Sequence, residues 1–210
     1  MVHANKVARN MSGSAQHSIP IVPRPNVLLI MGSMRPGRVC PQIAHWVAEI
    51  GESCTTLAFE VVDLADWPLP MNDEPGLPHR GEYIQPHTRA WSEKISSADA
   101  VVFVTPQYNW GYPAPLKNAI DHLYREWHGK PSAIISYGGH GGGKCAEQLR
   151  QVAAGLKMGM VATSPALTLS DDVIRDGLAL HPVTDLALHA DTIKQALVEL
   201  AVQIASTAGA

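Results

Sequence analysis

The sequence predicts an α/β protein with one parallel sheet that is covered by helices on both faces. Five apolar runs of strand length recur along the 210 residues, and segments with helical spacing of apolar residues separate them. Such continuous apolar runs are typical of strands buried on both sides. The chain has no internal repeat and is long enough for one domain with a sizeable core. We therefore expect residues 26–210 to form a single domain that follows a disordered tail of residues 1–25.

The first strand, the first helix and the second strand have clear boundary residues. Residues 26–31 form a continuous apolar run that Gly32 ends, which predicts a buried strand. A helix is expected from Pro41, which suits the first helical turn, to Gly51, which would stop it. Residues 56–63 are predicted to form the second strand.

The middle of the chain contains a long connection before the third strand. Residues 64–86 are rich in proline and predict a lid or an interface segment, because long loops in compact domains are usually functional. A short helix at residues 88–98 and a strand at residues 99–105 follow. The next helix is expected over residues 113–128, where four apolar side chains share one face: Leu116, Ile120, Leu123 and Trp127.

The last third of the chain predicts the remaining strands and helices. Residues 132–137 have strand character, and a turn with five glycines in six residues, 138–143, opens a helix. A fifth strand is expected near residues 160–163, with a restart at 166–169, and a closing helix at 186–206. Right-handed crossovers between parallel strands would place helices on both faces of the sheet.

Composition and charge narrow the class of protein. The net charge is −3, and no stripe of lysine and arginine with interleaved aromatics is present, so we expect no nucleic-acid partner. No apolar run approaches the roughly 18 residues that span a bilayer, so we expect no membrane partner. Three cysteines without CxxC spacing favour a reducing compartment, and the expected location is the cytoplasm. The ten histidines are scattered without an HExxH pattern, which predicts no metal site.

Three loops that follow strands carry chemical content, and in a parallel sheet all three emerge at the same edge. The first, residues 32–40, contains Ser33, Arg35 and Arg38. Guanidinium groups match phosphate oxygens, and the following helix would direct its positive end at the same place. Neither a Walker loop nor a GxGxxG fingerprint is present, so the loop suits one terminal phosphate; a turn with exposed arginines is the alternative. Cys40, at the end of this loop, is either a reactive thiol or, as we expect, a small packed residue.

The second and third loops suit a flat polar ring. Residues 105–112 combine prolines, which restrict the backbone, with Tyr108, Trp110 and Tyr112, which offer flat surfaces. In the loop 137–144, closely spaced glycines allow unusual backbone dihedrals or make room for a planar group. The alternatives are a rigid connector for the second loop and a flexible surface turn for the third. Together the three loops predict a site for a mononucleotide-like cofactor.

Three motifs give the chain a specific resemblance to a known family. Gly-Ser-x-Arg follows the first strand, Thr-Pro-Gln-Tyr-Asn the third, and Ser-Tyr-Gly-Gly-His-Gly-Gly the fourth. In this order, over roughly residues 26–160, they resemble the NAD(P)H-dependent FMN reductase family, and the runs at 109–121 and 124–131 are closest to its quinone reductase and azoreductase members. The resemblance implies a flavodoxin-like three-layer sandwich with a five-stranded parallel sheet of order 2-1-3-4-5, and a homodimer or homotetramer.

The resemblance also implies which residues hold the cofactor. By position, the FMN phosphate would be held by Ser33, Arg35 and Arg38. Hydride would pass from NADPH or NADH to flavin N5 and on to a quinone, azo compound, free flavin or related small acceptor, so no catalytic side chain is assigned. Two sets of residues would line the isoalloxazine ring, largely through backbone groups: Pro106, Gln107, Tyr108 and Asn109 on one edge, and Tyr137, Gly138 and Gly139 on the other.

Three places depart from the common family pattern. Gln107 replaces a frequent glutamate, and Trp110-Gly111 replaces a glycine-serine pair; both changes occur in the quinone reductase branch. Residues 38–40 stand where other members have serine and asparagine ligands of the phosphate, which leaves the phosphate contacts open.

Two other functions also fit the sequence. The first is a flavodoxin-like electron carrier or a flavin-binding regulatory protein, although carriers commonly have a strongly acidic docking face that a net charge of −3 does not suggest. The second is a biosynthetic reductase for one quinone-like metabolite, whose pocket residues 64–86 could shape. Trp110, Tyr112 and Trp127 either bury against a second subunit or pack within their own.

Overall fold

A parallel sheet forms the centre of the computed structural model, which describes residues 23–71 and 73–208. Its strands are β1 Asn26–Met31, β2 Ala58–Asp63, β3 Ala100–Pro106, β4 Pro131–Gly138, β5 Gly159–Met160 and β6 Ala166–Thr168. Their order is β2-β1-β3-β4-β5, with β6 also paired to β4, and each of these pairs is parallel. The expected parallel sheet of order 2-1-3-4-5 is therefore confirmed.

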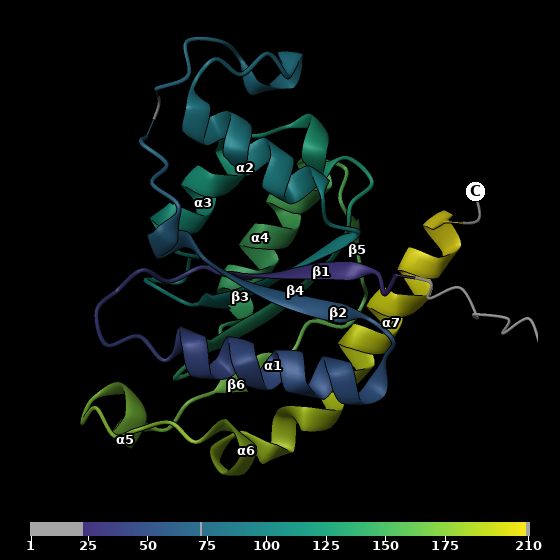
Figure 1. The fold of residues 1–210 in the computed structure, drawn as a ribbon. Helices are drawn as coiled ribbons and strands as arrows, with labels where there is room; N and C mark the ends of the chain where they lie inside the picture. Colours follow the sequence, from purple (N-terminus) through teal and green to yellow (C-terminus); the bar gives the residue numbers. More distant parts are fainter. Residues whose placement is uncertain (1–22, 72, 209–210) are drawn as a thin grey trace, which may run out of the picture.

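Helices cover both faces of this sheet. The longer ones are α1 Cys40–Cys54, α2 Pro86–Ser96, α3 Ala114–Asp121, α4 Gly143–Gly155 and α7 Ala190–Ala208. Helices α1 and α7 lie on one face and α2, α3 and α4 on the other (Figure 1). Among the described helices, none has the length and apolar composition needed to cross a membrane.

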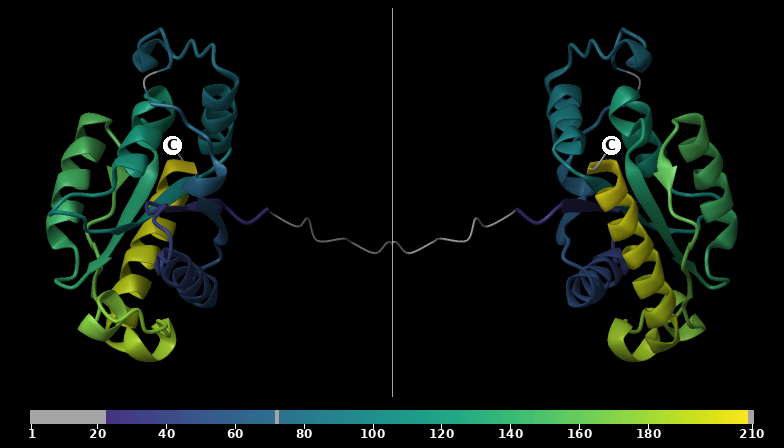
Figure 2. Two further views of the ribbon diagram at one scale, coloured as in Figure 1. Left: turned by 90° about the vertical axis from the view of Figure 1, so that its left-hand side faces the viewer. Right: turned by 90° about the vertical axis from the view of Figure 1, so that its right-hand side faces the viewer.

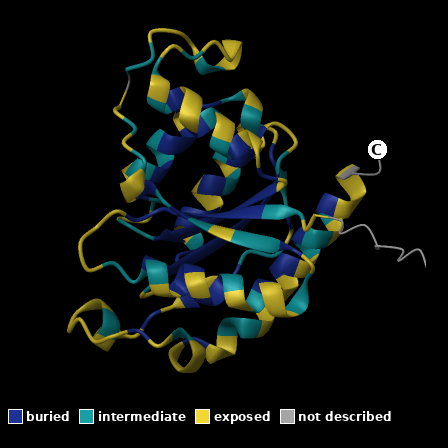
Figure 3. Ribbon diagram, viewed as in Figure 1, coloured by how far each residue is buried: buried dark blue, intermediate teal, exposed yellow. Residues whose placement is uncertain are grey.

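Alternate residues of the central strands face opposite helical layers. On β3, Val102 and Val104 pack in the cluster that includes α1 and α7, whereas Val101 and Phe103 pack with α2, α3 and α4. Every residue of β3 is buried, and the middle of the sheet is the most deeply buried part of the molecule (Figure 3). The continuous apolar runs in the sequence follow from this double coverage.

Helix α1 runs three residues past Gly51, the residue expected to stop it. Gly51 is buried inside the helix, where a Cβ atom would lie 2.3 Å from the Phe59 ring of β2. The glycine therefore allows α1 to approach the sheet closely, and it does not end the helix.

Helix α3 is shorter than predicted, because it ends at Asp121 and a separate 3-10 turn, η3, covers Arg125–Trp127. Two buried indoles bind the carbonyl groups near the end of this helix. Trp91 Nε1 donates to Ala119 O at 2.8 Å, and Trp127 Nε1 donates to Ile120 O at 3.0 Å. The two indoles thereby supply donors to carbonyls in the last turn of the helix, where intrahelical donors become scarce. Trp127 consequently packs within its own subunit.

The segment from β2 to α2 contains two 3-10 turns, η1 Leu64–Asp66 and η2 Pro78–Arg80, and extends past the ends of α2 and α3 (Figure 2). Two short helices before the last one, α5 Asp171–Ile174 and α6 Pro182–Asp185, were not expected from the sequence. A further 3-10 turn, η4 at Ala187–His189, occupies the start of the predicted closing helix. The expected N-terminal tail falls mostly on residues 1–22, which lie outside the described residues.

Candidate functional site

The loops after β1, β3 and β4 meet at the carboxyl edge of the sheet around a cavity of about 260 Å³. Ser33 and Asn109, two of the predicted site residues, do not line it. Ser33 is fully buried behind the cavity wall, and Asn109 is exposed at the tip of the second loop. The other predicted residues all contribute to the lining: Arg35, Arg38, Pro106, Gln107, Tyr108, Tyr137, Gly138 and Gly139.

Ser33 and Arg35 hold the first loop against the second. The Ser33 hydroxyl lies 2.7 Å from the Tyr108 hydroxyl, and either group can donate the hydrogen bond. The Arg35 guanidinium lies over the Tyr108 ring, with Cζ 4.0 Å from the ring centroid. Ser33 thus positions Tyr108, while Arg35 remains exposed beside the cavity.

Arg38 provides a donor that fits a phosphate group. One of its terminal nitrogens forms an ion pair with Asp63, at the end of β2. Its Nε is buried and has no hydrogen-bond partner among the described residues. Leaving a buried donor unpaired costs free energy, which an anion in the adjoining cavity would recover. The donors of this loop therefore suit the phosphate that the sequence predicted.

The second loop is a tight β-hairpin rather than a simple connector. Tyr108 N donates to Gly111 O at 2.8 Å, and Gly111 N donates to Tyr108 O at 2.9 Å. The two residues between them, Asn109 and Trp110, both have left-handed backbone conformations, with φ of 48° and 71°. Two-residue hairpin turns require this geometry, and glycine normally supplies it at the second position.

The side chain of Gln107 joins the second loop to the third. Its Oε1 accepts hydrogen bonds from Lys144 N at 3.1 Å and Cys145 N at 3.3 Å, which are amides in the first turn of α4. A side-chain oxygen from another loop therefore caps this helix. An amide oxygen can accept these bonds as a carboxylate does, which explains how glutamine can occupy this position.

The glycine-rich third loop is a tight turn held by packing. Gly141 and Gly142 have φ of 75° and 78°. A Cβ atom on Gly142 would lie 2.9 Å from both Ser136 Cβ and Tyr137 N. The glycines therefore meet backbone requirements of the turn, and the alternative of a loosely held surface turn does not fit this packing.

Tyr137 and Cys40 are buried at the back of the site. Tyr137 is 3% exposed, and its carbonyl accepts a hydrogen bond from Gln107 N at 2.9 Å. Burial raises the pKa of the Tyr137 hydroxyl, and burial likewise raises the pKa of the Cys40 thiol. The Cys40 thiol also donates to Val104 O at 3.4 Å. Cys40 is thus the packed residue that we expected, and its burial disfavours the reactive thiolate form.

Three apolar residues from outside the three predicted loops also line this cavity, and the sequence reasoning missed them. Leu169, Val173 and Ile174 line it from the end of β6 and from α5. They lie beyond the three motifs and beyond residue 160, where the resemblance seen in the sequence ended. Only the pairing of β6 with β4 brings this segment to the site.

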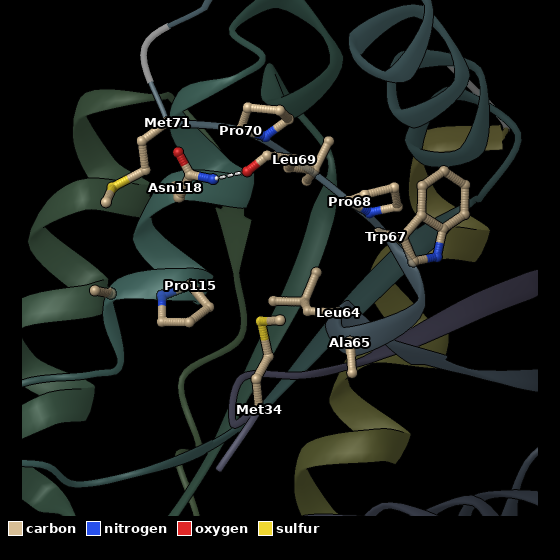
Figure 4. Close-up of a pocket in the computed structure, with 11 residues that line it drawn as sticks. Met34, Leu64, Ala65, Trp67, Pro68, Leu69, Pro70, Met71, Pro115 and Asn118 are labelled. Carbon is tan, nitrogen blue, oxygen red and sulfur yellow. Dashed lines mark hydrogen bonds between the residues drawn. The ribbon is translucent and has the colours of Figure 1, made fainter.

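A second cavity, of about 480 Å³, lies on the other side of the first loop (Figure 4). Met34 lines it from that loop, Pro115 from α3, and Trp67 and Met71 from the segment after β2. Asn118 anchors this segment by donating to Leu69 O at 2.7 Å. The long proline-rich segment therefore shapes an apolar pocket, as one of the sequence-based hypotheses required.

The fold also gathers histidines that are distant in sequence. One ligand atom each from Asp73, His87 and His122 lies within 4.8 Å of the others. His122 Nδ1 lies 3.0 Å from Thr88 Oγ1. His87 Nε2 lies 2.9 Å from Asp73 Oδ2, but neither this nitrogen nor Asp73 Oδ1 has a hydrogen-bond partner among the described residues. The second nitrogen of His122 is 3.1 Å from Pro70 O, and burial lowers the pKa of this imidazole. The cluster fastens the segment after β2 to α2 and α3.

Comparisons with known proteins identify the family of this chain. A model of the family described as NADPH-dependent FMN reductase matches residues 25–171. The NAD(P)H-dependent FMN reductase of Schizosaccharomyces pombe is 56% identical over 177 residues, covering 83% of this chain and 88% of that protein. The corresponding reductase of Saccharomyces cerevisiae is 45% identical over 183 residues, covering 79% and 95%. The NADPH:quinone oxidoreductase of Arabidopsis thaliana is 39% identical over 123 residues, covering 57% and 60%.

The fold agrees as well. A flavoenzyme from Paracoccus denitrificans, an NAD(P)H:(acceptor) oxidoreductase, superimposes with a TM-score of 0.65 and 21% identity over 87% of this chain and 98% of that chain. The flavodoxin-like fold expected from the sequence is thereby confirmed. The chain belongs to the NADPH-dependent FMN reductase family and is a flavin-dependent oxidoreductase.

Proposed function

We propose that the enzyme binds FMN in the cavity between the three loops and uses it to transfer hydride from NADPH or NADH to a quinone or related small acceptor. One observation carries the proposal. The cavity combines the guanidinium groups of Arg35 and Arg38 with an adjoining lining of peptide groups from the loops after β3 and β4. Guanidinium groups beside such a cavity suit a flat ligand that carries a terminal phosphate.

Each part of the cavity has a proposed role. Arg38 would bind the phosphate through its unpartnered Nε, and Arg35 would add a second charge from the exposed side. Residues 106–108 and 137–139 would contact the ring. Val173 and Ile174 would exclude water from one side of it. FMN, when bound, supplies the ring that accepts and donates hydride, so the protein side chains bind and orient.

The proposed acceptor is a quinone, because the plant relative is named for that substrate and quinones are flat. Azo compounds and free flavin are also flat and would fit the same stacking position. Because donor and acceptor would occupy this position in turn, ping-pong kinetics are expected.

The test is an absorption spectrum of the purified protein, followed by anaerobic addition of NADPH and then of a quinone. We expect bound flavin that NADPH bleaches and that the quinone restores. A colourless protein that takes up no FMN would contradict the cofactor site. Bound flavin that NADPH reduces only in the presence of a partner protein would favour an electron carrier.

We also propose that a second copy of the chain covers the apolar face around the cavity of Figure 4, giving a homodimer or, as a dimer of dimers, a homotetramer. Met34 and Met71 on this face are 42% and 72% exposed. Met71→Asp should shift the mass measured by light scattering toward that of the monomer. An unchanged mass would place the subunit interface elsewhere.

The proposed location is the cytoplasm. Cys40, Cys54 and Cys145 are all free thiols, as expected in a reducing compartment. Fractionation of cells that express the tagged chain would test this, and recovery in an oxidising compartment would contradict it.

A further inference from the structure

A third cavity adjoins the proposed flavin cavity and has a different chemical lining. It measures about 350 Å³ and lies between the hairpin after β3 and the start of α4. Gln107 lines both cavities, so a ligand that is stacked in the first can extend into the second. The other lining residues are Trp110, His140, Gly143, Lys144 and Glu147.

Trp110 gives this cavity an exposed aromatic surface. The residue is 67% exposed, whereas Trp91 and Trp127 are completely buried. Its φ of 71° belongs to the left-handed region, where a residue with a side chain costs free energy relative to glycine. An indole that stays exposed on a strained backbone is available to stack on a ligand, since neither the turn nor the core requires it.

Positive charge lies beside this indole. Lys144 Nζ is 5.5 Å from the centroid of the Trp110 ring. Among the described residues, no carboxylate forms an ion pair with Lys144. The backbone of Lys144 is fixed by the bond from its amide to Gln107 Oε1, at 3.1 Å. The positive end of α4 and the His140 imidazole add to the attraction for an anion.

Glu147 adds one negative group to the same lining, three residues further along α4. A carboxylate in this position disfavours a ligand that consists only of phosphate. It can, however, accept hydrogen bonds from the hydroxyl groups of a ribose. An aromatic surface, an ammonium group and a carboxylate together match an adenosine phosphate, which has a flat base, an anion and a sugar.

We propose that Trp110 and Lys144 bind the adenosine half of the dinucleotide, with the adenine stacked on Trp110 and a phosphate paired with Lys144. The inference rests on the proposed function, because the nicotinamide of the same molecule must reach the flavin cavity. The site favours NADPH over NADH, because the 2′-phosphate of NADPH brings additional negative charge to Lys144 and His140.

The experiment measures the dissociation constants of 2′,5′-ADP and 5′-AMP by calorimetry, with the FMN-loaded full-length protein. Trp110→Gly should weaken binding of 2′,5′-ADP about tenfold by removing the stacking surface, and Trp110→Phe should restore most of it. Lys144→Gln should weaken binding of 2′,5′-ADP about fivefold and reduce the preference for 2′,5′-ADP over 5′-AMP. The same variant should raise KM for NADPH more than it lowers kcat. Lys194→Gln, an exposed lysine of α7, is the matched control and should leave these values unchanged.

Wild-type affinity for 2′,5′-ADP in both Trp110→Gly and Lys144→Gln would overturn the inference, and equal wild-type affinities for the two nucleotides would overturn the preference for NADPH. A separate measurement tests the flavin site without any dinucleotide. It determines the FMN content of the protein, reduces the bound flavin with dithionite and follows its reoxidation by a quinone. If that half-reaction fails, the proposed function fails. If it succeeds but the wild-type protein does not bind 2′,5′-ADP, only the adenosine site is refuted.

Discussion

The hairpin after β3 and the glycine loop after β4 bend the backbone in the same way with different residues. Gly141 and Gly142 have φ of 75° and 78°, and Asn109 and Trp110 have φ of 48° and 71°. In the glycine loop, packing leaves no room for a side chain at Gly142. In the hairpin, the Trp110 side chain is free to extend into solvent. In the glycine loop, packing therefore dictates the backbone conformation. In the hairpin, the strained backbone carries a side chain that the packing does not require.

Gly142→Ala should have the largest effect, because it adds a Cβ atom 2.9 Å from Tyr137 N at a φ that disfavours side chains. We expect a loss of about 2–4 kcal/mol in the free energy of unfolding, measured by urea denaturation. Gly143→Ala is the matched control, because nothing lies within 4 Å of its added Cβ atom. Equal stabilities of the two variants would show that packing does not dictate the glycine loop.

Arg35→Ala tests whether the hairpin belongs to the cofactor site, because the Arg35 guanidinium lies on the Tyr108 ring. We expect FMN affinity to fall about tenfold, or about 1.4 kcal/mol, since this arginine is exposed and its pairing with phosphate is partly screened. Quenching of flavin fluorescence would measure the affinity. Arg35→Lys keeps the positive charge but loses the two parallel N–H donors of the guanidinium group, and it should give an intermediate FMN affinity. Unchanged affinity in Arg35→Ala would exclude this arginine from the phosphate site.

Gln107→Ala would disconnect the two loops by removing the acceptor for the amides of Lys144 and Cys145. We expect it to lower the free energy of unfolding by about 1–2 kcal/mol, as for the loss of a helix cap. Gln107→Glu should retain stability, because a carboxylate accepts the same bonds and interacts favourably with the helix N-terminus. A Gln107→Ala variant as stable as the wild type would mean that the loops hold their positions independently.

Trp110→Gly should have the smallest effect on stability, and of opposite sign. Relief of the left-handed strain should raise the free energy of unfolding by about 0.5 kcal/mol, measured by the same denaturation. Asn109→Gly is the comparison variant and should change stability less, because asparagine tolerates this conformation. A clear loss of stability in Trp110→Gly would show that the indole serves the fold, and the contrast between the two loops would disappear.

Much of the fold could be predicted because it depends on local patterns. The strand at 26–31 was predicted to the residue, since a continuous apolar run ended by glycine is a local signal. Errors arose where a distant contact overrode that signal. Gly51 looks like a helix end in sequence, but the Phe59 ring beside it makes it a packing glycine. The predicted helix over 113–128 breaks after Asp121, where Trp91 and Trp127 bind the carbonyls of α3.

In the candidate site, too, local patterns predicted some features and distant contacts decided others. The motifs identified the three loops, because glycine frees the backbone, proline restricts it and arginine carries a charged side chain wherever these residues occur. The side chains of these loops could not be assigned individually. Gln107 caps a helix that begins 36 residues later in the chain, and Ser33 bonds to Tyr108 rather than facing the cavity.

The sequence by itself thus determined most strands and helices and the loops that surround the cavity, because propensity, periodicity and turn chemistry act between near neighbours. Its three motifs indicated the family by resemblance. Only the tertiary structure decided which side chains face the cavity, that α5 completes its wall and that Trp110 stays exposed beside Lys144. These features depend on the register between parallel strands, which brings distant residues together and which no local pattern encodes.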